Sequence, residues 1–416
     1  MNLSEQTKLA HRMGSKTLSI LKADGTPLKN AEVTVAQTKH KFLFGGAEFS
    51  SIPFANGELL GEDENIAKDV FKKFFDLFNY TTIPFYWEKS KPEEVAAEES
   101  HLKKTAQWFQ SNHCTVKGHP LCWHTLFPPN MLEMTNPQIL DEQLKHIKHL
   151  ICSFQGIIDI WDVINEPVIM PVFDKYDNGI TRIAKEMGRF PLIRELFSCA
   201  KEADSHLTLS INDFVCTNID SYEILLEGCL ELGIPIDVIG IQSHMHQGYW
   251  GVEKTLHILE RFSKFHLPIH FTECTFVSGH YMPKEVVDFN DYIIDKWPST
   301  PEGEERQANE AALFYQVLFE HPSVESITWW EFVDGHWLGA PGGMITKEGR
   351  IKPIYEKMLK LIKYDWWTGS RQYIADEQGK IQVSGFYGDY EVMYKGMKKF
   401  FSIEESNEHI EGSVIL

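Results

Sequence analysis

Two glutamates stand where chemistry is most readily expected, because each follows an apolar run. Glu166 follows the run WDVIN and precedes Pro167, and Glu273 follows the run IHFT. Taken singly, either residue is typical of a salt-bridged strand end. Two carboxylates that meet at one pocket can cleave a glycosidic bond, since one protonates the leaving oxygen while the other attacks or activates water. Asn165 would place an amide beside the first carboxylate.

Neutral hydrogen-bonding groups and tryptophans end several other apolar runs. These residues are His119 and Trp123 in GHPLCWH, Asn212 before Asp213, Gln242 and His244 in IQSH, the pair Trp329-Trp330, and Trp337. Such groups suit sugars, whose hydroxyls need donors and acceptors and whose C–H faces stack on rings. Adjacent strand residues point in opposite directions, so we expect Trp330 to face the site and Trp329 to lie in the core.

A metal site is the competing use of such residues. The chain has 18 histidines, and His244-Met245-His246 is a possible two-ligand H-x-H motif. No H-E-x-x-H motif and no cysteine cluster supplies further ligands. We therefore expect no metal and no other cofactor, and we expect His246 to lie in a surface loop.

The middle of the chain predicts the scaffold that brings these residues together. Between residues 42 and 362, eight short apolar runs alternate with stretches of helical period. The runs are almost continuously apolar, which is typical of parallel strands buried on both faces. The alternation predicts an α/β fold, a (β/α)8 TIM barrel, with Glu166 and Glu273 ending the fourth and seventh strands at its mouth. A doubly wound sheet is the structural competitor, but no G-x-G-x-x-G or P-loop opens a helix.

Both ends of the chain read as β structure. Residues 1–41 contain two alternating runs, 17–21 and 31–35, joined by turn signals, and they predict a small β-hairpin. Residues 363–416 alternate again around a glycine-containing turn. We expect this tail to pack near the hairpin as a small β-appendage to the barrel, with the last residues, EESNEHIEGSVIL, loosely held.

Composition narrows the function classes. The chain has 416 residues, of which 43% are hydrophobic and 12% aromatic, as in a folded protein with a large core. Its formal net charge of −19 argues against nucleic acid or an anionic membrane as partner. The seven cysteines are an odd number without metal-site spacing, and the first residues lack the apolar segment of a signal peptide. We therefore expect a reducing compartment, the cytoplasm.

Together these motifs resemble those of the family 10 glycoside hydrolases, the retaining endo-β-1,4-xylanases of clan A. The matching motifs, in family order, are GHPLCWH, WDVINEP, Asn212-Asp213, IGIQSH, FTE and ITWW with Trp337. The resemblance implies cleavage of β-1,4-xylan or xylo-oligosaccharides by double displacement, with Glu166 as acid/base and Glu273 as nucleophile. Asn165 would bind the 2-hydroxyl at the cleavage subsite. The expected substrate-binding residues are Asn165, His119, Trp123, Asn212, Gln242, His244, Trp330, Trp337 and Tyr86.

The chain departs from the family pattern at several positions, as in a divergent branch. Thr82, Ile83 and Tyr86 stand where the family usually carries the Glu, Asn and Lys that bind the −2 sugar. Thr275 replaces an aspartate two residues after the nucleophile, and Asn130 stands where tryptophan is common. These changes leave open an exo-acting or aryl β-xylosidase or β-glucosidase. A metal-dependent barrel hydrolase and a non-catalytic sugar-binding protein are the remaining alternatives. Short imported xylo-oligosaccharides would suit a chain without a leader.

Overall fold

A computed structural model describes residues 7–215, 219–405 and 410–415 of the protein. The chain divides into two compact units, one formed by residues 44–355 and the other by both chain ends, residues 1–43 and 356–416. Across the described part of the chain, no helix combines the length and apolar character needed to cross a membrane.

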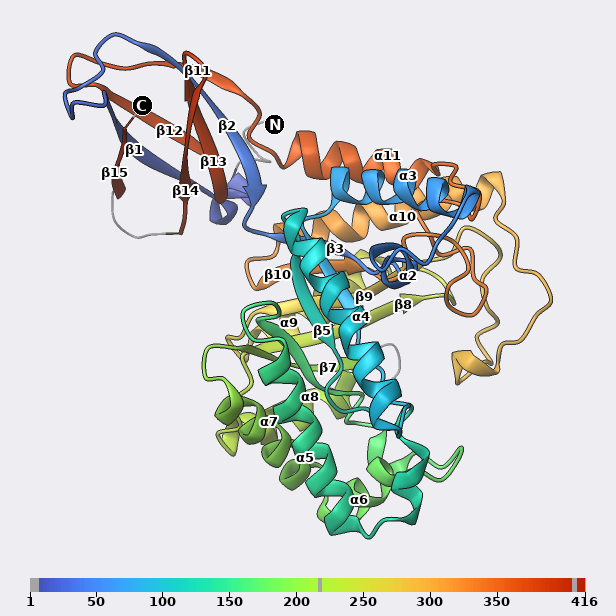
Figure 1. Ribbon diagram of the computed structural model, residues 1–416. Coiled ribbons are helices and arrows are strands. Elements are labelled where there is room, and N and C mark those ends of the chain that lie inside the picture. Colours follow the sequence, from blue (N-terminus) through green and yellow to red (C-terminus); the bar gives the residue numbers. More distant parts are fainter. Residues whose placement is uncertain (1–6, 216–218, 406–409, 416) are drawn as a thin grey trace. The chain divides into compact units, whose positions relative to one another are not determined.

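The larger unit is built on a closed eight-stranded barrel with the neighbour order β10-β3-β4-β5-β6-β7-β8-β9 (Figure 1). Its strands are β3 (Leu43–Gly46), β4 (Tyr80–Pro84), β5 (Thr115–His119), β6 (Ile160–Asn165), β7 (Thr208–Phe214), β8 (Val238–Met245), β9 (Ile269–Phe276) and β10 (Val324–Trp329). Each overlaps one of the eight expected runs. The predicted (β/α)8 barrel is therefore confirmed.

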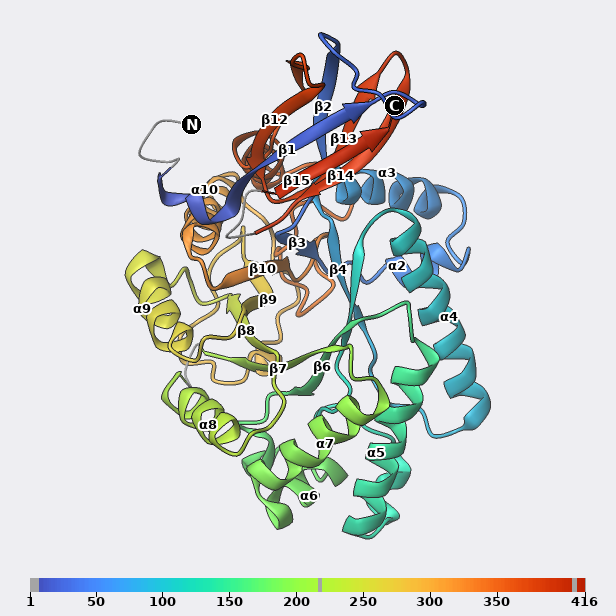
Figure 2. The same cartoon turned by 90° about the vertical axis from the view of Figure 1, so that its left-hand side faces the viewer.

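Helices surround the strands (Figure 2). They are α2 (Ser51–Ala55), α3 (Glu62–Leu77), α4 (Pro92–Ser111), α5 (Asn136–Ser153), α6 (Gly179–Met187), α7 (Arg189–Ala203), α8 (Ile219–Glu231), α9 (Gly251–Ser263) and α10 (Pro301–Glu320), whereas α11 (Pro353–Lys360) contains the boundary between the two units. In α3 the side chains of Val70, Phe71, Phe74 and Leu77 are buried, and this spacing places them on one face. Local signals set the helix starts: Thr135 and Gln138 form a capping box at α5.

The smaller unit is a sandwich of two sheets, ordered β12-β1-β15 and β11-β2-β13-β14. Its strands are β1 (Met13–Leu21), β2 (Glu32–His40), β11 (Arg371–Ile374), β12 (Lys380–Phe386), β13 (Gly388–Tyr394), β14 (Met397–Ile403) and β15 (Ile410–Ile415). A core that includes Leu18 and Ile20 of β1 and Val33 and Val35 of β2 lies between them. The expected β-appendage built from both chain ends is thus present.

The predicted N-terminal hairpin is wrong, although both of its strands form. β1 pairs with β12 and β15, whereas β2 pairs with β11 and β13 in the other sheet. The Leu28 amide donates to the Ile20 carbonyl at 2.9 Å, and the chain then crosses to the second sheet. The two alternating strands bury their apolar faces in the same core. Alternation identifies the buried face of a strand but not its partner.

The expectation of a loosely held C-terminus is also wrong for the described residues 410–415. They form β15, which runs parallel to β1 with Lys16 opposite Ile410 and Leu21 opposite Ile415. The edge of β1 that does not pair with β12 offers backbone groups, and a polar sequence can pair with these as well as an apolar one. Residues 406–409 and 416 lie outside the described residues.

Candidate active site

Glu166 is the first residue after β6, and its backbone conformation is unusual. Its φ of 55° lies in the left-handed region, which non-glycine residues seldom occupy and which proline as the next residue disfavours further. Neighbouring β7 holds this turn: the Glu166 amide donates to the Asn212 carbonyl at 2.8 Å, and the Val168 amide donates to Asp213 Oδ2 at 2.9 Å. The strained turn directs the carboxylate into the mouth of the barrel.

Two side chains donate hydrogen bonds to the Glu166 carboxylate. Trp123 Nε1 lies 2.9 Å from Oε2, and Gln242 Nε2 lies 3.2 Å from Oε1. Burial raises the pKa of Glu166 to about 7, with a smaller contribution from the charge of Glu273, although these hydrogen bonds act in the opposite direction. Glu166 can therefore hold a proton near neutral pH.

Glu273, inside β9, is 4% exposed and better supplied with donors. His244 Nε2 lies 2.9 Å from its Oε2, and Asn212 Nδ2 donates to Oε1 at 2.9 Å. His119 Nε2 is 3.9 Å from the same Oε1. Burial alone would raise the pKa of Glu273, but the His244 hydrogen bond and then the charges of His119 and His244 outweigh it and lower the pKa. Glu273 is thus held as the anion.

Three amides connect the two carboxylates. Asn165 Oδ1 accepts from Asn212 Nδ2 at 2.8 Å and from Gln242 Nε2 at 3.1 Å. The same two donors reach Glu273 and Glu166, respectively. Because Oδ1 of Asn165 is used twice within the network, its amide orientation is fixed.

A buried ion pair orients His119 from beneath. His119 Nδ1 lies 2.8 Å from Asp162 Oδ2, which also pairs with Lys117 Nζ at 2.6 Å. Lys117 and Asp162 are at most 1% exposed, inside the barrel. Because Nδ1 donates to the carboxylate, Nε2 of His119 is turned toward Glu273. Sequence reasoning missed this pair, although a charged residue inside an apolar strand is a usable signal.

Aromatic rings surround the carboxylates. Trp330 lies with its ring centroid 5.5 Å from that of His119 and 6.1 Å from that of His244. Trp329 is fully buried and donates from Nε1 to the Gly342 carbonyl. The Trp337 ring is 4.5 Å from His244, and the Tyr86 ring is 5.7 Å from Trp123. The structure thus brings together all eleven residues expected at the site.

His246 does not lie in a surface loop as expected; it is fully buried. Its ring contacts those of Phe289, Trp297 and Trp337 at centroid distances of 5.3, 6.0 and 5.0 Å. The connection between β9 and α10 supplies the first two of these rings and covers the histidine. Within the described residues, no group of three His, Cys, Asp or Glu side chains is placed to hold a metal ion.

The departures from the family pattern have different consequences. Thr82 and Ile83 lie in β4 and are 4% and 1% exposed, and Tyr86, two residues after the strand, contacts the ring of Trp123. Thr275 Oγ1 lies 3.0 Å from His244 Nδ1 and occupies the place of a carboxylate partner. A hydroxyl orients the imidazole but does not stabilise its positive charge as an aspartate would.

Glu331, directly after Trp330, is a further residue that sequence reasoning missed. It is fully buried, and its Oε2 accepts from the Trp337 amide at 3.0 Å. Burial raises the pKa of Glu331 to about 8. The carboxyl group fixes the turn that carries the Trp337 ring to His244. In the sequence, a glutamate directly after the tryptophan pair of the eighth strand could have indicated this residue.

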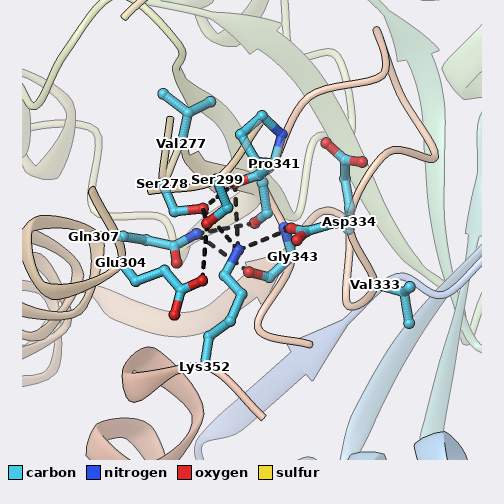
Figure 3. A network of polar contacts seen from close by, with 12 residues as sticks. Val277, Ser278, Ser299, Glu304, Gln307, Val333, Asp334, Pro341, Gly343 and Lys352 are labelled. Atoms are coloured by element: carbon cyan, nitrogen blue, oxygen red, sulfur yellow. Dashed lines mark hydrogen bonds and ion pairs between the residues drawn. The ribbon is translucent and has the colours of Figure 1, made fainter. Parts of the chain in front are cut away.

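Beside the mouth, a polar network centred on Lys352 ties the connections after β9 and β10 together (Figure 3). Lys352 is fully buried, and its Nζ donates to Asp334 Oδ1 at 2.8 Å and to Ser278 Oγ at 2.9 Å. Asp334 Oδ1 also accepts from the Gly343 amide at 2.8 Å. The two segments anchored in this way follow β9, which carries Glu273, and β10, which ends one residue before Trp330.

This geometry contains the parts required for acid-assisted displacement at a sugar. One carboxyl group is held near a protonated state, a second is held ionised, and amide, imidazole and indole groups surround them. General acid catalysis needs the first, and a nucleophile or a base needs the second.

Comparison with known proteins agrees with this chemistry. The model of glycosyl hydrolase family 10 matches residues 65–360. Endo-1,4-beta-xylanase B of Thermotoga neapolitana is 27% identical over 293 residues, which cover 67% of this chain and 78% of that protein. The anti-sigma-I factor RsgI6 of Acetivibrio thermocellus is 23% identical over 384 residues, 90% of this chain and 44% of that protein.

The fold is shared with solved structures. The crystal structure of native xylanase 10B from Thermotoga maritima superposes with a TM-score of 0.62 at 22% identity, covering 78% of this chain and 96% of that one. The architecture of the barrel is therefore common to the two proteins.

Proposed function

Because this chain belongs to glycosyl hydrolase family 10, we propose that it cleaves β-1,4-xylosidic bonds in xylan or xylo-oligosaccharides as an endo-1,4-β-xylanase. The observation that carries the proposal is the opposite tuning of two neighbouring carboxyl groups. The pKa of Glu166 is raised to about 7, and that of Glu273 is lowered.

In the proposed reaction, a Glu273 oxygen attacks the anomeric carbon while Glu166 protonates the leaving glycosidic oxygen. The glycosidic bond breaks and a covalent glycosyl-enzyme forms. Glu166, now ionised, removes a proton from water, and the resulting oxygen attacks the same carbon and displaces Glu273. Two displacements retain the configuration at the anomeric carbon.

The surrounding groups support these roles. Asn212 and His244 donate to the Glu273 anion and keep it ionised until it attacks. Asn165 is fixed between the two carboxyl groups, and we propose that it binds the 2-hydroxyl of the sugar being cleaved. The rings of Trp330, Trp337 and Tyr86 would line the subsites with faces on which sugars can stack.

The test is the product profile from xylohexaose for the wild type and three alanine variants. We expect xylobiose and xylotriose from the wild type, no turnover by Glu273→Ala, and a loss of about 10²–10⁴-fold in Glu166→Ala, the usual contribution of a general acid. The Glu166 variant should lose least on aryl glycosides, whose leaving groups need no proton. Glu325→Ala, at an exposed position of β10, is the matched control and should keep full activity.

Release of xylose alone would contradict endo action. Turnover like the wild type by Glu273→Ala or Glu166→Ala would refute the assigned roles.

A further inference from the structure

Two connections that leave the barrel beside the two carboxylates meet outside its mouth. Lys175 lies between β6 and α6, nine residues after Glu166 in the sequence. Asp288 and Asp291 lie on the long connection between β9 and α10, which extends beyond the ends of β8 and β9 (Figure 1). Lys175 Nζ is 2.7 Å from Asp288 Oδ2 and 2.6 Å from Asp291 Oδ1. Because β7 and β8 separate β6 from β9 in the barrel, these ion pairs span that part of the rim.

The β6 side of this bridge is anchored next to Glu166. The Tyr176 hydroxyl donates to the Thr125 carbonyl at 2.8 Å, two residues after Trp123, whose indole donates to Glu166. The Phe173 ring packs on His124 with centroids 4.7 Å apart. Burial raises the pKa of Tyr176, and the charges of Asp288 and Glu166 make smaller contributions in the same direction, which is consistent with a position near both.

The β9 side is anchored next to the residues that hold Glu273. The Phe289 ring, between the two aspartates, contacts buried His246, and His246 contacts Trp337. Asp288 is preoriented because its Oδ1 accepts from the amide and the side chain of Asn290 at 2.9 and 3.0 Å. Gln247 donates to the carbonyls of Pro283 and Val286, each at 2.8 Å, and fixes the start of the same connection.

We propose that Lys175, Asp288 and Asp291 form a strap across the leaving-group side of the site and thereby favour glycosides with short aglycones over long β-1,4-xylan chains. The inference rests on the proposed function, because it takes Glu166 as the acid that contacts the leaving oxygen. Sugars attached to that oxygen extend past Glu166, where the strap lies. A short aglycone fits inside the strap, whereas a long chain must displace it.

The strap disfavours long chains rather than excluding them. All three side chains are more than a third exposed, and ion pairs of that kind are individually weak and screened by salt. Opening the strap therefore costs little free energy, and only the binding of a long aglycone requires it to open.

The test compares kcat/KM on unsubstituted xylan with kcat/KM on an aryl β-xylobioside, whose leaving group is a single ring. In Lys175→Ala the ratio of xylan to aryl activity should rise about two- to thirtyfold, the range expected for two exposed ion pairs. Lys145→Ala is the matched control, because Lys145 also contacts two acids, Asp141 at 2.7 Å and Glu142 at 2.8 Å, but on α5. Added salt should raise the ratio in the wild type and in this control, but not in Lys175→Ala. An unchanged ratio in Lys175→Ala would overturn the strap.

Amide hydrogen exchange separates this proposal from the proposed function. Residues 286–293 should exchange faster in Lys175→Ala than in the wild type or Lys145→Ala, whatever substrate the enzyme accepts. Equal exchange in all three proteins overturns the strap. A wild type that cleaves neither substrate contradicts the xylanase assignment, and exchange then decides the strap alone.

Discussion

Glu166 and Glu273 have the same side chain but receive hydrogen bonds from different donors. Glu273 receives hydrogen bonds from an imidazole and an amide with a second imidazole nearby, whereas Glu166 receives them from an indole and an amide. Positively polarised donors stabilise a carboxylate, and burial opposes ionisation. At Glu166 burial outweighs the donors and the pKa rises, whereas at Glu273 the donors outweigh burial and the pKa falls. One site can therefore hold an acid and an anion at the same pH.

This balance predicts the pH dependence of kcat/KM. Activity should rise as Glu273 ionises below its ordinary pKa of 4.5 and fall as Glu166 loses its proton at about pH 7. Trp123→Phe removes a hydrogen bond that favours ionised Glu166, so the alkaline limb should move to higher pH. Trp87→Phe is the control, because the Trp87 ring stacks on that of His146, with centroids 3.8 Å apart. Rates measured over the pH range decide the point, and an alkaline limb that stays in place in Trp123→Phe would contradict it.

At the scale of elements, the barrel was predictable because buried parallel strands are contiguous apolar runs, and their ends identify the site. The strand partners in the sandwich were not predictable. β1 pairs with β12, which begins at residue 380, and no local pattern in residues 13–21 identifies that partner. For the same reason, the sequence did not indicate which residues hold the site residues in place. Asp162 under His119 and Asp213 under the turn at Glu166 act across neighbouring strands, and such contacts depend on register and side-chain direction.

The Lys352 network predicts how the connections around the mouth are stabilised. Lys352→Met removes the lysine that pairs with buried Asp334, and removal of one member of a buried ion pair typically costs about 3–5 kcal/mol. The free energy of unfolding, measured with urea, should fall by about that amount. Lys352→Met with Asp334→Asn should recover part of the loss, since no unpaired charge remains. Lys398→Met is the control, because Lys398 is exposed and pairs with Glu391 in the sandwich. Equal, small losses in Lys352→Met and Lys398→Met would show that the buried pair is dispensable.

At the scale of the whole molecule, all eleven expected site residues belong to one compact unit, residues 44–355, while both chain ends build the other. The sandwich depends on strands from both ends, because β1 and β2 have only C-terminal partners among the described strands. Its core likewise mixes Leu18 and Val35 from one end with Val383 and Val392 from the other. Neither end can complete a sheet or bury its apolar face without the other.

This interdependence predicts that removing one chain end is worse than removing both. A variant of residues 1–365 keeps β1 and β2 but exposes their apolar faces and unpaired edges, so it should aggregate in size-exclusion chromatography with light scattering. A variant of residues 42–365 lacks every strand of the sandwich and retains all the site residues. It should stay monodisperse and keep kcat/KM on xylo-oligosaccharides within a few fold of the full chain. A well-behaved 1–365 variant would show that β1 and β2 do not require their C-terminal partners. A folded but inactive 42–365 variant would mean that the sandwich contributes to catalysis, which its separate core gives no reason to expect.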